Sequence, residues 1–152
     1  MRKGLLLVLV VVMALSLVAA PSFSRTAKAQ DGDVLKIGLM ADLSAVLQLY
    51  GVELENGFTL GLDYATGGTM TVAGRPVEII VRDYANDADL AATQARELIE
   101  VEGVEVLVVA PSSRVTLALV DIAAEYDVIL MAGPAADPGL TGQYFKPTTF
   151  RA

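Results

Sequence analysis

Short runs of apolar residues recur along the chain and are separated by longer segments of mixed polarity. The runs lie at residues 34–40, 77–81, 104–110 and 128–132. Short runs bounded by turn residues are typical of strands that are buried on both faces of a parallel sheet. The pattern therefore predicts four strands of this kind.

The segments between these runs carry apolar residues at helical spacing. Leu54, Phe58 and Leu62 follow one another at intervals of four, which places them on one face of a helix. Gly67 supplies a left-handed residue to end this helix, and Asp87 is a suitable N-cap for the next one. Helices are predicted over residues 52–65, 88–102 and 115–126.

Strands and helices alternate in this prediction, which is the order of repeated β-α-β units. Right-handed crossovers between successive parallel strands place helices on both faces of such a sheet. We therefore expect an α/β fold with a doubly wound, mostly parallel sheet and helices on both of its faces.

Residues 1–29 form a separate and strongly apolar segment. Two basic residues precede an apolar run at residues 5–20, and Ala29 ends a stretch with the small residues that a signal peptidase requires. A membrane span takes about 20 apolar residues, so the run is short for an uncleaved anchor, which is the alternative. We expect a signal peptide that is cleaved after Ala29, so that residues 30–152 form the folded part.

The charge balance of the chain is acidic. It contains 11 Lys and Arg residues against 18 Asp and Glu residues, a formal net charge of −7. Every charged residue of the predicted signal peptide is basic, so the folded part is more acidic still. Nucleic acids and anionic lipids require clustered basic side chains, so neither is an expected partner.

The chain contains neither cysteine nor histidine. Their absence removes disulfides, thiolate chemistry, and the commonest general base and metal ligand. The sequence also lacks a Gly-rich dinucleotide motif, a phosphate loop and a G-x-S-x-G turn. Asp83 and Asp87 could suggest a cation site, but a strand end and a helix cap explain them more simply. We expect no catalytic residue, no metal and no cofactor, and predict that the protein is not an enzyme.

A ligand site in an open α/β sheet lies beyond the carboxyl ends of the strands, where the strand order reverses. Those ends correspond to residues 41–51, 111–114 and 133–141, three loops with small residues and hydroxyls. Exposed backbone amides and hydroxyls at helix starts suit a ligand carboxylate. These three loops are the predicted site.

Five segments of the chain form an ordered set of motifs. They are LKIGLMADLSAVLQLYG, AGRPVEIIVRD, VEVLVVAPSS, VILMAGPAADPGLTG and FKPTTFRA. Over residues 34–152 this set resembles the leucine/isoleucine/valine-binding type of periplasmic substrate-binding protein. The resemblance implies a monomeric periplasmic receptor of two lobes, which captures an amino acid or a similar small solute and delivers it to the membrane subunits of an ABC importer. Residues 30–152 would form the first lobe, and we expect a truncated chain from which the second lobe is absent.

The resemblance also assigns ligand contacts in the first of the three loops. Ser44 is the serine of this loop, and Tyr50 is the aromatic residue before its glycine. The ring of Tyr50 has an alternative role, which is to pack in the interface between the two lobes.

Further contacts are implied in the other two loops. The loop after the third strand supplies a hydroxyl from Ser112 or Ser113, although an ungapped alignment places Arg114 at this position. Alternatively, the two serines cap the helix that follows. In the loop after the fourth strand, Ala135 and Ala136 would offer backbone groups to the carboxylate of the ligand.

Asp137 is the last candidate ligand contact that the resemblance gives in this loop, but it departs from the threonine that the family has at this position. A carboxylate here would repel the carboxylate of a ligand unless it pointed away. We expect Asp137 instead to cap the turn at Pro138, because proline is a good first helical residue.

Two other classes of protein use the same kind of fold. A ligand-binding sensory module would be followed by a transmembrane segment and a signalling domain. A flavodoxin-like enzyme or carrier would bind a flavin. The motifs favour the transport receptor over both alternatives.

Overall fold

The computed structural model describes residues 33–152 of the chain. The predicted signal peptide at residues 1–29 and its cleavage site lie outside the described residues. In the part that the structure describes, no helix combines the length and the hydrophobicity that are needed to cross a bilayer.

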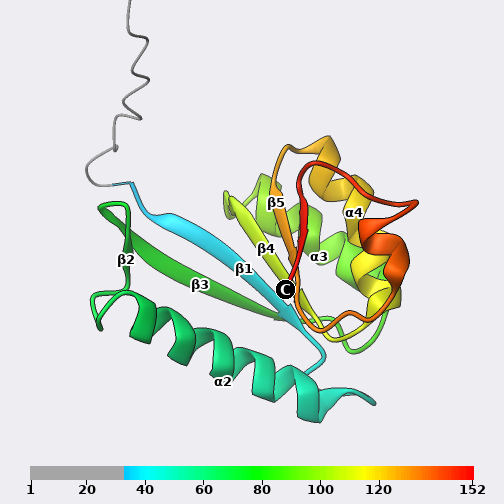
Figure 1. Ribbon diagram of the computed structural model, residues 1–152, viewed down its shortest axis with the longest axis horizontal. Helices are drawn as coiled ribbons and strands as arrows, with labels where there is room; N and C mark the ends of the chain where they lie inside the picture. Colours follow the sequence, from blue (N-terminus) through cyan, green and yellow to red (C-terminus); the bar gives the residue numbers. More distant parts are fainter. Residues whose placement is uncertain (1–32) are drawn as a thin grey trace, which may run out of the picture.

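Within residues 33–152, six strands form one sheet in the order β2-β3-β1-β4-β5-β6. They are β1 (Leu35–Ala41), β2 (Thr71–Val72), β3 (Arg75–Asp83), β4 (Val106–Ala110), β5 (Ile129–Ala132) and β6 (Thr149–Arg151). The short strand β2 pairs antiparallel with β3, and the other pairs are parallel. Figure 1 shows the long strands β1 and β3 side by side, with the shorter β4 and β5 next to β1.

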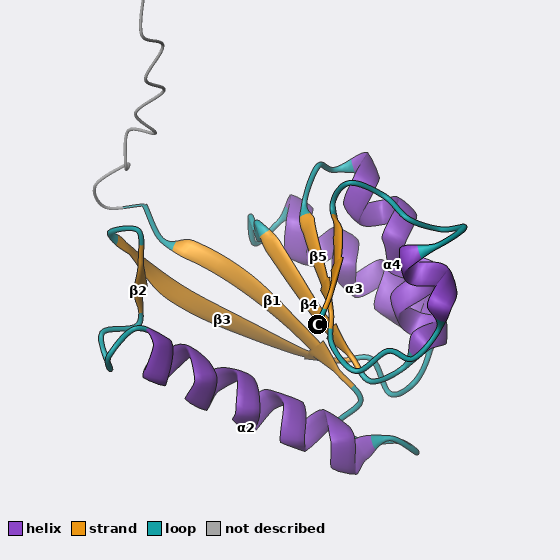
Figure 2. Cartoon of the chain, in the orientation of Figure 1, coloured by secondary structure: helices purple, strands orange, loops and turns teal. Residues whose placement is uncertain are grey.

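Helices cover the sheet on both faces (Figures 1 and 2). They are α2 (Gln48–Ala65) on one face, and α3 (Ala88–Glu100) and α4 (Ser113–Glu125) together on the other. A short 3-10 helix, η1 (Pro138–Thr141), follows β5. The predicted doubly wound, mostly parallel sheet with helices on both faces is therefore confirmed.

The central strand β1 shows why the apolar runs are continuous. Leu39 and Met40 are adjacent and fully buried, yet they belong to opposite faces of the sheet. Leu39 lies in the cluster that contacts Phe58 of α2, whereas Met40 lies in the cluster that contains Leu98 of α3 and Leu119 of α4. A strand with helices on both sides has no solvent face, so both sets of alternate residues are mainly apolar, and Lys36 near the start of β1 is the exception.

Helix α2 begins at Gln48, earlier than the predicted start at residue 52. Its first turn includes Leu49 and Tyr50, which are both exposed, so this turn has no apolar stripe to mark it. The end of the helix follows the prediction, because Gly67 has a positive φ of 61° directly after the C-cap Thr66.

The sequence did not predict the short elements β2, β6 and η1 as strands or helices, and at η1 only a turn at Pro138 was expected. Each has two to four residues, and the two strands pair at the outer positions of the sheet. In β6 only Thr149 is buried, while Phe150 and Arg151 are exposed. Such elements depend on a neighbouring strand or turn for their hydrogen bonds, so they leave no apolar run in the sequence.

Candidate functional site

The strand order reverses at β1. From β1 the chain passes through α2 to β3 on one side, and then crosses through α3 to β4 on the other side of β1. The loops that follow β1 and β4 therefore lead to helices on opposite faces of the sheet, and open α/β sheets bind ligands in the crevice between two such loops, at the carboxyl edge of the sheet. The predicted site loops lie at this edge.

The loop after β1 is shaped by a buried carboxylate. Asp42 is fully buried, and its two carboxylate oxygens accept hydrogen bonds from the amides of Ala45 at 2.7 Å and Leu47 at 2.8 Å. Both bonds hold the loop in a compact turn, with Ser44 exposed near its apex. The loop leads into α2, where the side chain of Tyr50 is 55% exposed. Ser44 and Tyr50 are thus both accessible at the start of α2.

Gly51 lets α2 approach the end of β1 closely. A Cβ atom on this residue would lie 1.9 Å from the backbone carbonyl oxygen of Asp42. Only glycine allows this approach, so the first turn of α2 rests directly on the backbone at the carboxyl end of β1.

A second carboxylate fixes the same loop from the side of β3. Asp83 Oδ1 accepts hydrogen bonds from the amides of Leu43 at 2.9 Å and Ala85 at 2.8 Å. Burial raises the pKa of Asp83, but interaction with the Ser44 hydroxyl and these two amides outweighs burial and lowers the pKa below its ordinary value. Asp83 is therefore an anion at neutral pH.

The loop after β4 brings two serines to the start of α4. Ser112 is buried at the N-cap position, and its carbonyl accepts from the amide and the hydroxyl of Thr116. Within the described part of the chain, the Ser112 side chain makes no capping hydrogen bond. Ser113 is the first residue of α4, and its Oγ accepts from the amide of Asp137 at 3.2 Å. Arg114 is exposed and donates instead to the carbonyl of Asn86 in the turn before α3.

The loop after β5 lies against the loop after β4. A Cβ atom on Gly133 would be 2.7 Å from the Cβ of Ala110, the last residue of β4, so this loop begins close to the point where the loop after β4 begins. Ala135 is buried and Ala136 is exposed. Asp137 accepts from the amide of Gly139 at 2.7 Å and is the N-cap of η1, which confirms the predicted turn at Pro138.

The structure thus collects the predicted residues at one edge of the sheet. Ser113 and Asp137 join two of the loops directly. Ser44 and Tyr50 belong to the other wall, which the loop after β1 and the start of α2 form. Asp42 and Asp83 hold this loop through hydrogen bonds from its backbone amides. Among residues 33–152, no three acidic side chains come together in the way that a metal ion requires. The groups available to a ligand are hydroxyls and backbone amides.

A family model described as periplasmic binding protein matches residues 34–152 of the chain. The chain belongs to this family. The resemblance stated from the motifs is confirmed, and the family is one of binding proteins rather than of enzymes. A comparison with curated proteins gave no match.

Several solved structures are similar to this member of the family. An ABC-type branched-chain amino acid transporter from Rhodopseudomonas palustris CGA009 is 33% identical with a TM-score of 0.75, covering 78% of this chain and 32% of that one. An ABC transporter substrate-binding protein from Sphaerobacter thermophilus is 30% identical with a TM-score of 0.72, over 78% and 32%. The LivJ protein of Streptococcus pneumoniae, solved in complex with isoleucine, is 25% identical with a TM-score of 0.70, over 78% and 33%. The chain spans about a third of the length of these structures.

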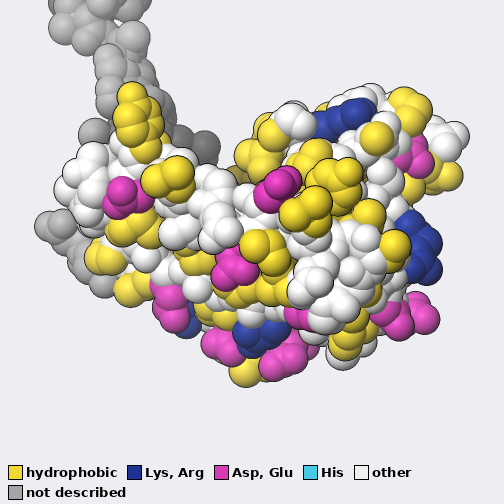
Figure 3. Space-filling model, turned by 90° about the horizontal axis from the view of Figure 1, so that it is seen from below, with side chains coloured by type: hydrophobic (Ala, Val, Ile, Leu, Met, Phe, Trp, Pro, Cys, Tyr) yellow, Lys and Arg dark blue, Asp and Glu magenta, His cyan; other side chains and the backbone are white. Residues whose placement is uncertain are grey.

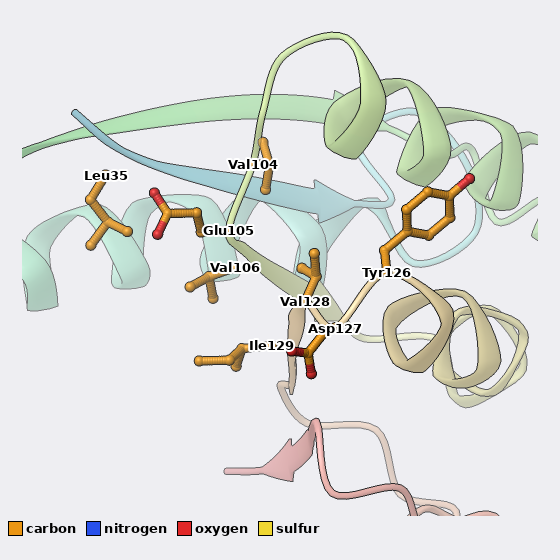
Figure 4. A pocket seen from close by; sticks show the side chains of 8 residues that line it. All are labelled: Leu35, Val104, Glu105, Val106, Tyr126, Asp127, Val128 and Ile129. Carbon is orange, nitrogen blue, oxygen red and sulfur yellow. The ribbon is translucent and has the colours of Figure 1, made fainter. Parts of the chain in front are cut away.

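Two hollows in the surface of this periplasmic binding protein lie away from the crevice. One has a volume of about 540 Å³ at the amino edge of the sheet, where Figure 4 shows the apolar side chains of Leu35, Val106 and Ile129 with the carboxylate of Glu105. Glu105 is already paired with Arg75, and this hydrogen bond lowers the pKa of Glu105. The other carboxylate of the hollow belongs to Asp127, which is exposed, so the polar groups of this hollow are acidic and its remaining lining is mostly apolar.

The other hollow has a volume of about 600 Å³ beside α2. It is lined by Glu55, Asn56, Thr59, Leu60, Asp63 and Met70. Figure 3 looks onto the molecule from the side of α2 and shows apolar and acidic side chains interspersed on this face.

Three residues of the crevice were not singled out as site residues from the sequence. Asp42 and Asp83 each bind backbone amides of the loop after β1. Tyr84 is fully buried, and its hydroxyl contacts the loop after β4. The one available signal was their position, because Asp42 and Asp83 each stand at the carboxyl end of an apolar run.

Proposed function

We propose that residues 30–152 form the first lobe of an extracytoplasmic receptor, which captures an amino acid or a similar small polar solute and delivers it to the membrane subunits of an ABC importer. The observation that carries this proposal is the convergence of three loops, rich in hydroxyls and amides, at the switch point of a sheet from a binding-protein family. In this proposal a second lobe closes over the crevice and supplies the remaining contacts. The family's name supports a periplasmic location.

The wall formed by α4 is suited to an oxygen-rich group. Ser113 Oγ accepts from the amide of Asp137, so the hydroxyl proton of Ser113 is left to donate to a ligand. The first-turn amides of α4 have no carbonyl partner within the helix and carry partial positive charge. Ser112 and Ser113 together with these amides would bind a carboxylate. The backbone of Ala135 and Ala136 adds to the same wall.

The opposite wall presents Ser44 and Tyr50. The exposed ring of Tyr50 would cover an aliphatic side chain of a bound amino acid or contact the second lobe on closure. The isoleucine complex of the Streptococcus pneumoniae LivJ protein makes L-isoleucine a suitable first probe. The carboxylate of Asp137 caps η1, so we assign this residue the role of shaping the loop.

Ligand binding to the mature full-length protein tests the proposal. We expect L-isoleucine, L-leucine, L-valine, an amide or a short carboxylate to raise the melting temperature in a concentration-dependent way, because a ligand that binds only the native state stabilises it. Calorimetry then gives the affinity of each hit. No response to any member of this panel would contradict the proposed function.

A single hydroxyl tests the location of the site. Ser113→Ala removes the proposed donor, and we expect the affinity for the best ligand of the panel to fall about tenfold. Thr93→Ala is the matched control, since it removes an exposed hydroxyl of α3 that bonds within its own helix to the carbonyl of Asp89. Equal affinities of the two variants would place the site elsewhere.

A further inference from the structure

The carboxyl end of β3 contacts both walls of the crevice. Asp83 is the last residue of β3, and its carboxylate accepts from the amide of Leu43 in the loop after β1 at 2.9 Å. Tyr84 is the next residue. Its hydroxyl donates to the carbonyl of Ala110 at 2.7 Å and accepts from the amide of Ser112 at 3.3 Å. Two adjacent residues therefore reach both loops that flank the switch point.

Tyr84 makes this contact across the central strand. Its backbone amide donates to the carbonyl of Ala41, the last residue of β1, at 3.0 Å. β1 separates β3 from β4 in the sheet, and the side chain of Tyr84 lies fully buried in the cluster on the side of α3 and α4. The ring thus passes from β3 across the end of β1 to the end of β4.

Both hydrogen-bonding functions of the Tyr84 hydroxyl are used inside the protein. Burial raises the pKa of Tyr84 to about 12, so the phenol keeps its proton at neutral pH and donates it to Ala110. Its oxygen is the partner of the Ser112 amide. Phenylalanine at this position would leave both backbone groups without this partner in a buried site.

We propose that Asp83 and Tyr84 are positioning residues, which hold the two walls of the crevice at a fixed separation before a ligand binds. The inference rests on the proposed function in one respect, namely that these walls contact the solute. Neither side chain touches the ligand in this proposal. Asp83 acts through Leu43 and the exposed Ser44, and Tyr84 acts through Ser112 and the start of α4.

Amide hydrogen exchange in the ligand-free, mature full-length protein gives the first test. We expect the amides of Leu43 and Ser112 to be protected in the wild-type protein. In Tyr84→Phe the amide of Ser112 should exchange about tenfold faster. The amide of Gly133, which donates to the carbonyl of Val109 at 2.8 Å, is the internal reference and should keep its rate. Unprotected wild-type amides, or an unchanged rate for Ser112 in Tyr84→Phe, would overturn the proposal.

Calorimetric titration with L-isoleucine gives the second test. We expect the Kd of Tyr84→Phe to rise about tenfold. Without the Tyr84 hydroxyl, the wall at the start of α4 would have to become ordered when the ligand binds, and this ordering weakens binding. Tyr126→Phe is the matched control, since it removes the same atom from a tyrosine whose hydroxyl contacts Glu100 and Arg96. Figure 4 shows Tyr126 beside the hollow at the amino edge. Equal Kd values for wild type, Tyr84→Phe and Tyr126→Phe would overturn the positioning role.

Asp83 supplies a second pair of variants if Tyr84→Phe does not fold. Asp83→Ala removes the acceptor of the Leu43 amide, and we expect several-fold weaker binding of L-isoleucine. Asp83→Asn keeps an oxygen that accepts from Leu43 and should restore most of the affinity. A folded Asp83→Ala protein with wild-type affinity would overturn the proposal for this wall.

The two tests separate this inference from the function on which it rests. Wild-type protein that binds neither L-isoleucine nor any other member of the panel contradicts the proposed receptor. The exchange measurement needs no ligand, so protection of Leu43 and Ser112 that depends on Asp83 and Tyr84 would still support a preformed crevice. Protection that arises only after L-isoleucine is added would mean that the ligand orders the walls.

Discussion

Gly51 should be the most sensitive glycine of α2, because it is the point at which the helix touches β1. In Gly51→Ala the new Cβ would lie 1.9 Å from the carbonyl oxygen of Asp42, whereas ordinary van der Waals contact begins at about 3.4 Å. The carbonyl oxygen of Asp42 belongs to the backbone directly after the central strand β1, so it has little freedom to move away. Helix propensity favours alanine by about 1 kcal/mol, and overpacking costs about 1–3 kcal/mol or more when backbone must shift. Because the clash is with backbone, the overpacking cost should lie at the upper end of this range or above it, so we expect a net loss of about 2 kcal/mol in the free energy of unfolding after the propensity gain is subtracted.

Gly57 gives the matched control within the same helix. It is exposed, and a Cβ atom there would meet nothing within 4 Å. Gly57→Ala should therefore stabilise the protein by about 0.5–1 kcal/mol through propensity alone. Urea unfolding followed by circular dichroism measures both variants against the wild type. If Gly51→Ala unfolds at the same urea concentration as Gly57→Ala, the result contradicts the close packing of α2 against the end of β1.

Three further predictions follow from other parts of the molecule. Asp83→Asn should be less stable than the wild type at pH 7. The urea midpoints of the two proteins should converge as the pH falls below about 4, because a carboxyl group with a lowered pKa in the folded state stabilises the fold only while it is ionised. Leu119→Ala removes a fully buried side chain and should cost about 2–5 kcal/mol, whereas Leu60→Ala, at a position that is 69% exposed, should change stability by less than about 0.5 kcal/mol in the same assay. Mass spectrometry of the exported protein should find Gln30 as its first residue; retention of the apolar segment would indicate a membrane anchor.

The main strands were predictable because their sequence signal does not depend on distant contacts. In β1 the residues Leu39 and Met40 are buried on opposite faces, and a strand of this kind requires apolar residues at most positions of both faces. The start of α2 was not predictable in this way. It depends on Asp42 binding the loop amides and on Gly51 meeting the backbone of β1, and neither contact produces a periodic pattern.

The location of the candidate site was also predictable, whereas the way in which it is held together was not. Alternating strands and helices place the loops after β1, β4 and β5 at one edge, whatever their exact residues. The contacts of Tyr84 with Ala110 and Ser112 join segments that are more than 25 positions apart in sequence. They arise because β1 lies between β3 and β4, and the spatial order of strands cannot be read from residue spacing.

The aspartates at the crevice have a common structural role, which bears on the kind of ligand that fits. Asp42 binds the amides of Ala45 and Leu47, and Asp83 binds the amide of Leu43. Asp137, on the other wall, accepts from the amide of Gly139. Each of these carboxylates is held by backbone amides of the crevice loops, so the acidic side chains at this edge serve to shape the loops. Under the proposed function, the hydroxyl protons of the serines and the first-turn amides of α4 remain for the solute, and these donors favour a ligand that presents oxygen acceptors to this edge.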